Sequence, residues 1–173
     1  MSVFSFDATV GTSTSNSYVS VTEFTDYFSR FPFDTDIPLD DSNLIERLLT
    51  SATFSIDNSI NFDSWETDFQ SQALKWPRTG LVDERLLIIP NNSIPKRLKN
   101  ATCLLALWLY EECANDNTSD VDSNPQEVKL GGRANIISMN YKPNSDRVMI
   151  PTNVMQELMR IGPDIVLENR ITR

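Results

Sequence analysis

Three aspartates in the middle of the chain have the spacing closest to a metal site, because alternate carboxylates in a loop can converge on one calcium ion. They are Asp116, Asp120 and Asp122. A calcium loop that began at Asp116 would need glycine at its sixth position, where Val121 stands. The pattern therefore predicts a solvated acidic loop and no metal site.

The residue types give little support to catalytic chemistry. The chain contains no histidine, which excludes histidine-based triads and the usual zinc sites. Glu111 and Glu112 are adjacent, so on a helix their side chains diverge by about 100° and cannot form a close acid/base pair. Cys103 and Cys113 lie about 15 Å apart along one predicted helix, too far for a disulfide. We expect no catalytic, cofactor-binding or metal residues and a protein that is not an enzyme.

A long amphipathic helix over 95 to 112 is the central element that positions these residues. Pro95 suits a first helical position, because its fixed φ fits and its missing N–H needs no partner there. Apolar or small residues then recur three and four positions apart. They are Leu98, Ala101, Thr102, Leu105, Trp108 and Leu109. This spacing predicts a mostly buried helix.

Four further segments have helical spacing, which predicts a mainly α fold built as a four- to five-helix bundle. A capping box formed by Ser20 and Glu23 begins the first helix, either Asp41 or Ser42 caps the second, and Thr152 caps the last. The residue before a proline avoids the α region, so a further helix is expected to end near Trp76. With the long helix, the expected helices span about 21 to 31, 42 to 60, 64 to 74, 95 to 112 and 152 to 161.

The 173 residues, with 40% hydrophobic content, suit one domain with a short arm. Residues 128 to 141 form a β-type run with a glycine pair, so a small β-hairpin or an extended segment precedes the last helix. Gly162 and Pro163 end that helix, which divides the chain into a helical domain over 1 to 162 and a C-terminal arm over 163 to 173. The arm keeps four apolar residues that a purely solvated tail would not need: Ile165, Val166, Leu167 and Ile171.

Charge is unevenly divided along the chain, whose net charge is -9. Residues 1 to 74 hold 12 acidic and two basic residues, a net -10, whereas residues 75 to 173 hold 12 acidic and 13 basic residues, a net +1. Such an acidic face serves solubility, repels nucleic acid or meets a basic face of another copy. The longest apolar run, 103 to 110, is far shorter than the roughly 18 residues that span a bilayer, so we expect a soluble, unexported protein.

The charged residues of the long helix are placed against its macrodipole, with bases at the N-terminal end and acids at the C-terminal end. Local helix stability does not explain this placement. Either nearby loop residues such as Asp83 and Glu84 neutralise the bases, or the charges contact a neighbouring copy, since a head-to-tail contact needs two different complementary patches. The residues concerned are Lys96, Arg97, Lys99, Glu111 and Glu112.

Six large aromatic residues could stack nucleic-acid bases, as in proteins that bind single strands. They are Phe54, Phe62, Trp65, Phe69, Trp76 and Trp108. Their spacing predicts instead that most of them are core residues. A pI near 4.4 also disfavours strand binding, because such binding depends on the release of counterions by lysine and arginine.

Three blocks of sequence occur in a recognisable order. Asn16-Ser17-Tyr18-Val19-Ser20 comes first, and Trp76-Pro77-Arg78-Thr79-Gly80 follows. Two Ile-Pro pairs at 89–90 and 94–95 then lead into a K-x-A-x-x-x-L-A helix. In this order, over roughly three quarters of the chain, the blocks resemble those of the head-tail connector (adaptor) proteins of tailed bacteriophages. Members of that family have also been labelled DnaT-like single-stranded-DNA-binding domains.

The resemblance implies a structural protein of the phage neck. Connectors of this type stack as a homo-oligomeric ring beneath the portal protein, usually in about twelve copies. They extend the DNA channel and offer a platform to the next neck or tail protein. The resemblance thus implies a place in the virion at the head-tail junction, in the host cytoplasm during assembly, with no membrane partner and with genomic DNA passing through the lumen without specific binding.

Two sets of residues acquire expected roles from this resemblance. The resemblance assigns the reversed charges of the long helix to contacts between ring subunits. These residues are Lys96, Arg97, Lys99, Glu111 and Glu112. The apolar residues of the arm become a portal-binding segment: Ile165, Val166, Leu167 and Ile171. The alternative function is that of an accessory protein of replication that binds single-stranded DNA.

Overall fold

The computed structural model describes residues 5–30, 37–62, 64–83, 85–115, 150–161 and 165–167. Within these residues the fold is rich in helix and has two small antiparallel sheets of two strands each. The helices are α1 (Val21–Ser29), α2 (Ser42–Ser59), α3 (Lys96–Asn115) and α4 (Thr152–Met159). The strands are β1 (Ile60–Phe62), β2 (Trp65–Glu66), β3 (Arg78–Thr79) and β4 (Ile165–Leu167). The predicted mainly α character is therefore present.

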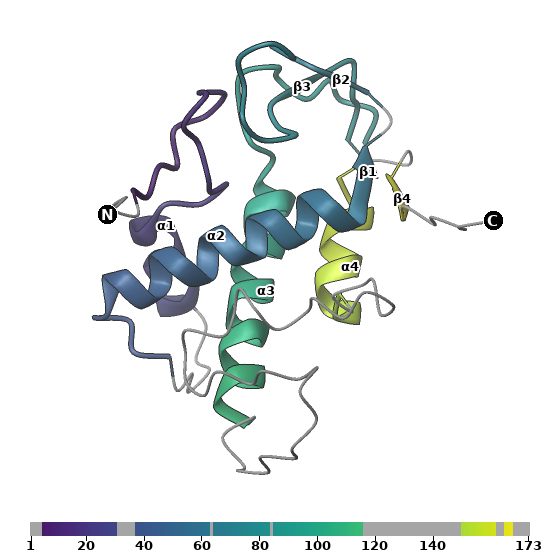
Figure 1. The fold of residues 1–173 in the computed structure, drawn as a ribbon. Coiled ribbons are helices and arrows are strands. Elements are labelled where there is room, and N and C mark those ends of the chain that lie inside the picture. Colours follow the sequence, from purple (N-terminus) through teal and green to yellow (C-terminus); the bar gives the residue numbers. More distant parts are fainter. Residues whose placement is uncertain are drawn as a thin grey trace, which may run out of the picture.

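The four helices form what we call the helical body, in which α2 crosses α3 and α4 packs beside α3 (Figure 1). Its core is built from the apolar faces that the sequence spacing predicts. From α2 and α3 these faces supply Leu44, Ile45, Leu48, Leu49, Ala52, Ile56, Leu98, Ala101, Leu105 and Leu109. Thr102 is also buried, and its hydroxyl donates to the carbonyl oxygen of Leu98 at 2.9 Å. Trp108 is only partly buried at the edge of this core.

Local capping signals place the helix starts. Ser20 and Glu23 form the predicted capping box at the start of α1. Asp41 caps α2 by accepting from the backbone N–H of Leu44 at 3.1 Å. The helix α3 begins at Lys96, one residue after the predicted start at Pro95. Thr152, predicted to cap the last helix, is instead its first residue, because Pro151 holds the cap position.

The helix predicted over 64 to 74 is absent. These residues form β2 and a series of turns, and β2 pairs with β3 in the register Trp65↔Thr79 and Glu66↔Arg78. The spacing of Trp65 and Phe69 fits a helix, but both side chains are exposed, so no apolar face is buried to stabilise one. The prediction that a helix ends near Trp76 is wrong for the same reason.

The segment from 60 to 91, which we call the loop region, joins α2 to α3 through β1, β2 and β3 and lies beyond one end of the helical body (Figure 1). Its turn at Gly80 has a φ of 85°, in the left-handed region that glycine adopts without steric cost. The strand β1 pairs with β4 in the register Ile60↔Leu167 and Phe62↔Ile165.

The strand β4 lies in the segment predicted as a C-terminal arm, and the division of the chain at residue 162 stays a prediction. Residues 165–167 of the predicted arm are hydrogen-bonded to β1 and are not a free extension. The interaction therefore gives this part of the arm an intramolecular role. Ile171, the hairpin or extended segment predicted over 128 to 141, and the aspartates 116, 120 and 122 lie outside the described residues. Among the described helices none is long and apolar enough to cross a membrane.

Candidate interaction site

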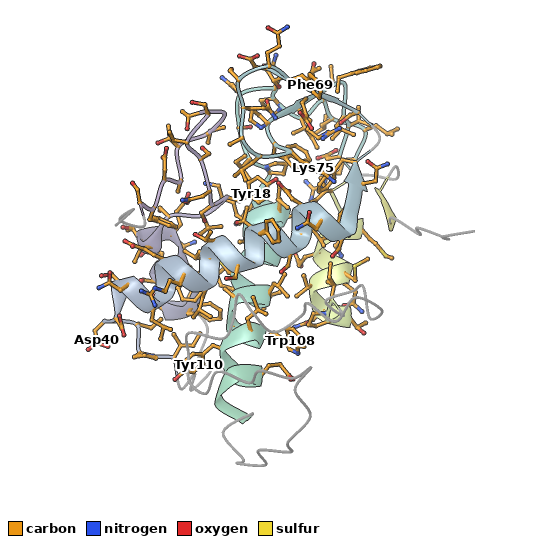
Figure 2. The ribbon with its side chains drawn as sticks, viewed as in Figure 1. Tyr18, Asp40, Phe69, Lys75, Trp108 and Tyr110 are labelled. Carbon is orange, nitrogen blue, oxygen red and sulfur yellow. The ribbon has the colours of Figure 1, made fainter. Side chains whose placement is uncertain are left out.

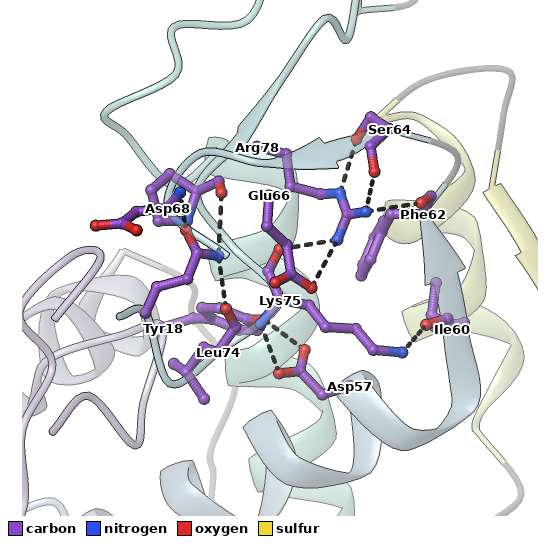
Figure 3. A network of polar contacts seen from close by, with 12 residues as sticks. Tyr18, Asp57, Ile60, Phe62, Ser64, Glu66, Asp68, Leu74, Lys75 and Arg78 are labelled. Carbon is purple, nitrogen blue, oxygen red and sulfur yellow. Dashed lines mark hydrogen bonds and ion pairs between the residues drawn. The ribbon is translucent and has the colours of Figure 1, made fainter. Parts of the chain in front are cut away.

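Arg78 of the second sequence block holds the loop region together (Figure 3). Its side chain is buried, with 6% exposed, and its Nε donates to Ser64 Oγ at 2.7 Å. Its Nη2 donates to the carbonyl oxygen of Phe62 and its Nη1 to that of Lys75, both at 3.0 Å. Burial lowers the pKa of Arg78, and the carboxylate of Glu66, 3.7 Å away, opposes that effect. The guanidinium therefore joins backbone on both sides of the loop region.

Asp57 on α2 joins the first sequence block to the second (Figure 3). Its carboxylate accepts from the hydroxyl of Tyr18 and from the backbone N–H of Lys75, the latter at 3.1 Å. Tyr18 is also anchored to α2, since its backbone N–H donates to Thr53 Oγ1 at 3.2 Å. Burial raises the pKa of both Asp57 and Tyr18. The two blocks thus have a shared structural role, which their separation in the sequence concealed.

This network borders an open depression of about 350 Å³. Phe54, Asp57, Glu66, Gln72 and Lys75 line it, together with residues of the N-terminal segment. Two of its charged groups are engaged: Asp57 accepts two hydrogen bonds, and Lys75 Nζ donates to the carbonyl oxygen of Ile60 at 3.0 Å. Within the described parts of the chain there is also no group of three or more potential metal ligands. The depression has the character of a contact surface.

Trp65 and Phe69, which we call the aromatic patch, extend from the loop region into solvent with 82% and 81% of their surfaces exposed. Figure 2 shows Phe69 in the loops at the top of the view, whereas the Tyr110 side chain lies beside the lower part of α3. Their backbone is fixed: Thr67 N–H donates to the carbonyl oxygen of Pro77 at 3.0 Å, and Asp68 N–H donates to Gln72 Oε1 at 3.0 Å. The patch is therefore a rigid aromatic surface.

The six aromatic residues divide differently from the prediction that most are core. Trp76 and Phe62 are buried and their rings meet edge to face, with centroids 5.5 Å apart. Trp108 is partly buried, whereas Phe54, Trp65 and Phe69 are exposed. The prediction is wrong for these three, because helical spacing alone does not reveal whether another element covers the face.

A second apolar surface follows β3. Leu86, Leu87 and Ile88, which we call the apolar loop, are 78%, 62% and 81% exposed. The carboxylate Oδ1 of Asp83 accepts from the backbone N–H groups of Arg85 at 2.8 Å and Leu87 at 2.9 Å. The N–H of Asp83 donates to the carbonyl oxygen of Leu87 at 2.8 Å, and Val82 bridges to Ile88.

Leu86 has a φ of 62°, in the left-handed region that a leucine rarely adopts. Such strain persists where the surrounding contacts fix the backbone, and it is concentrated at functional sites. The hydrogen bonds of Asp83 supply these contacts. The hydrogen bonds of Asp83 therefore hold the apolar loop in its exposed conformation.

Arg97 and Lys99 at the start of α3 pair with acidic residues of the same chain. Arg97 Nη1 lies 3.1 Å from Glu157 Oε2 of α4, and the Nζ of Lys99 forms an ion pair with Glu23 of α1. The neutralising residues are thus Glu157 and Glu23, and not Asp83, which the first of the two alternatives from the sequence had named. Burial raises the pKa of Glu23, but the hydrogen bonds from Lys99 and Ser20 outweigh it and the pKa is lowered.

The remaining residues of the predicted subunit contact are exposed and far apart. Lys96 is exposed at the first residue of α3, and Glu111 and Glu112 are exposed near its last turn. A helix of this length separates the two groups by over 20 Å, so the structure does not bring them together in one copy. Their contact with neighbouring subunits stays a prediction.

Comparison with known proteins gives one match. A family described as "Putative DnaT-like ssDNA binding protein" matches residues 5–169. No curated protein and no solved structure matches the chain.

Proposed function

The chain belongs to this DnaT-like family, and from that premise we propose that it is a structural connector of a tailed-phage neck. In this role it forms a homo-oligomeric ring beneath the portal protein, extends the DNA channel and carries the next neck or tail protein. The order of the sequence blocks, which resembles that of phage adaptors, supports the assignment. DNA passes through the ring without being held.

One observation carries the proposal: the loop region exposes large apolar side chains on a rigid backbone among carboxylates. Trp65 and Phe69 are exposed, and Glu66 and Asp68 lie between them in the sequence. Exposed apolar surfaces rimmed by polar groups are typical of protein–protein contacts. A protein whose main task is to assemble with other proteins needs such a surface.

The second candidate function is the binding of single-stranded DNA, which the family description and the exposed aromatic patch favour. Stacking on aromatic rings is the usual way to hold unpaired bases, but it acts together with a basic groove. The loop region has only three basic residues in its sequence. Arg78 is buried and Lys75 donates to a backbone carbonyl, so they are poorly placed to receive phosphates.

Two measurements separate these functions. Electron microscopy of the purified protein, with and without the portal protein of its own phage, should show rings that co-assemble with the portal. Fluorescence anisotropy with a labelled single-stranded oligonucleotide should show no saturable binding at physiological salt, because the acidic chain releases few counterions.

The opposite pattern would reject the connector role. Failure of rings to form with the portal, together with micromolar oligonucleotide binding, would favour the DNA-binding candidate. In that case Trp65→Ala should abolish the oligonucleotide binding, whereas Met159→Ala, at an exposed apolar residue of α4, should leave it unchanged.

A further inference from the structure

We propose that the apolar loop of one copy docks on the aromatic patch of the next copy, so that the chain associates with itself head to tail. This inference rests on the proposed function and identifies the contact that would build the ring. It places the contact on Leu86, Leu87 and Ile88 on one side and on Trp65 and Phe69 on the other.

The apolar loop has the properties of the inserted partner. Three consecutive apolar side chains are exposed at its tip. Asp83 fixes the loop backbone through its carboxylate and its own N–H, so little conformational entropy remains to be lost when the loop docks. The left-handed backbone at Leu86 is retained although it buries nothing within the chain. We take docking on another copy as the reason that this conformation is kept.

The aromatic patch has the properties of the receiving partner. Tryptophan and other aromatic residues on rigid backbone are enriched among the residues that dominate protein–protein affinity. Glu66, which directly follows Trp65, lines the depression of about 350 Å³ together with Phe54. The exposed ring of Phe54 adds apolar surface to that depression.

Charge complementarity favours a second copy as the occupant. Arg85 is exposed directly before the apolar loop, and Asp68 is exposed directly before Phe69 in the aromatic patch. On the inserted side the Asp83 carboxylate is engaged by backbone N–H groups, so the exposed Arg85 guanidinium is the group that faces the carboxylates of the receiving side, as expected for the rim of a specific contact. The same carboxylates repel a phosphate backbone, which argues against a nucleic acid on this surface.

We infer a head-to-tail contact because the proposed ring requires one, whereas reciprocal docking of the two surfaces would give only a closed dimer. Trp65, Phe69, Leu86 and Ile88 are all highly exposed within one copy, so the apolar loop does not rest on the aromatic patch of its own chain. Two different complementary surfaces give a heterologous contact, which closes a ring when the rotation between neighbours permits.

Two variants of the full chain test this directly. Leu87→Asp removes the inserted surface and keeps the aromatic patch, whereas Phe69→Asp removes the aromatic surface and keeps the loop. Met159→Asp adds the same charge at an exposed apolar residue of α4, outside both surfaces, and is the matched control. Sedimentation velocity over a concentration series up to about 1 mM measures association in the range of weak contacts, and circular dichroism checks that each variant folds.

The expected result is a complementation. The wild-type chain and the control associate progressively, while each variant alone has its Kd raised at least about tenfold, as for central interface residues. An equimolar mixture of the two variants forms a dimer of wild-type affinity and stops there, because it retains only one intact pair of surfaces. A wild-type chain that stays monomeric, a mixture that fails to dimerise or a control that is equally weakened would overturn the proposal.

Electron microscopy with the portal distinguishes the failure of this inference from failure of the proposed function. If rings form on the portal and both variants enter them as efficiently as the wild type, the contact is wrong and the connector role stands. If the variants complement each other in solution but no ring forms on the portal, the contact stands and the connector role is wrong.

Discussion

The helical body and the loop region belong to one chain, yet different interactions stabilise them. The helical body buries its apolar side chains, among them Leu48 and Leu105 with no exposed surface. The loop region also buries Phe62 and Trp76, but its apolar loop and aromatic patch lie in solvent, and polar side chains that bond to backbone, chiefly Arg78 and Asp83, hold it in place. The difference shows how a small protein can keep a rigid apolar surface free without exposing its core.

Replacing a leucine by alanine in each region tests the contrast in burial and gives the largest expected effect. Leu105→Ala should lower the free energy of unfolding by about 2–5 kcal/mol, because it leaves a cavity in the helical body. Leu87→Ala in the apolar loop should change it by no more than about 0.5 kcal/mol. Urea denaturation followed by circular dichroism measures both values, and equal effects would show that the apolar loop is buried after all.

A smaller effect is expected when the polar support of the loop region is removed. Arg78→Ala should cost about 3 kcal/mol, because it leaves the carbonyl oxygens of Phe62 and Lys75 without their charged donor. Arg78→Lys should recover only a minor part, since lysine lacks the planar fork that reaches several acceptors.

Limited proteolysis should locate that damage. Cleavage of the Arg78→Ala chain should begin within residues 64 to 83 while the helical circular dichroism is retained. Arg85→Lys, at an exposed arginine of the same region, should match the wild type in both measurements. Loss of helical signal at the same denaturant concentration as loop cleavage would show that the two regions are stabilised as a unit.

Backbone strain in the apolar loop gives a third, still smaller effect. Leu86→Gly should be more stable than Leu86→Ala by about 1 kcal/mol, because glycine adopts a positive φ without the steric cost that any other side chain has there. Both variants remove the exposed leucine side chain, so the comparison isolates the backbone. Equal midpoints in urea would mean that the left-handed conformation is not maintained in solution.

The smallest effect concerns the N-terminal segment, which is also organised by a polar side chain. Hydrogen bonds from Thr14 and Thr9 lower the pKa of Asp7 from 3.8 to about 2. A lowered pKa stabilises the folded state above pH 3.8, and this contribution is lost as the pH falls toward about 2. Carboxyl carbon NMR should give that midpoint, and Thr14→Val should raise it toward 3.8.

The sequence allows prediction of the helical body because its signals are local. The capping box of Ser20 and Glu23 and the apolar stripes of α2 and α3 need only neighbouring residues to be interpreted. The error over 64 to 74 has a physical cause: Trp65 and Phe69 have helical spacing, but no element covers them. Periodicity records which residues share a face and does not record whether that face is buried.

The site was harder to predict because its contacts are distant in sequence. Arg97 pairs with Glu157, 60 residues away, and Tyr18 meets Asp57 across 39 residues. The pairing of β4 with β1 likewise joins residues 165–167 to residues 60–62, which are far away in the sequence. Resemblance identified the blocks that contain Tyr18 and Arg78, and only the fold revealed that both support the loop region.

The fluorescence of Trp65 and Trp76 responds to different events, because one of the two side chains is exposed and the other is buried. Trp76 is 1% exposed and Trp65 is 82% exposed. Unfolding transfers Trp76 to water and shifts its emission to longer wavelength, whereas a partner that covers Trp65 shifts emission to shorter wavelength and shields that indole from acrylamide. Fluorescence of the unlabelled chain can therefore separate docking from loss of structure in a single titration.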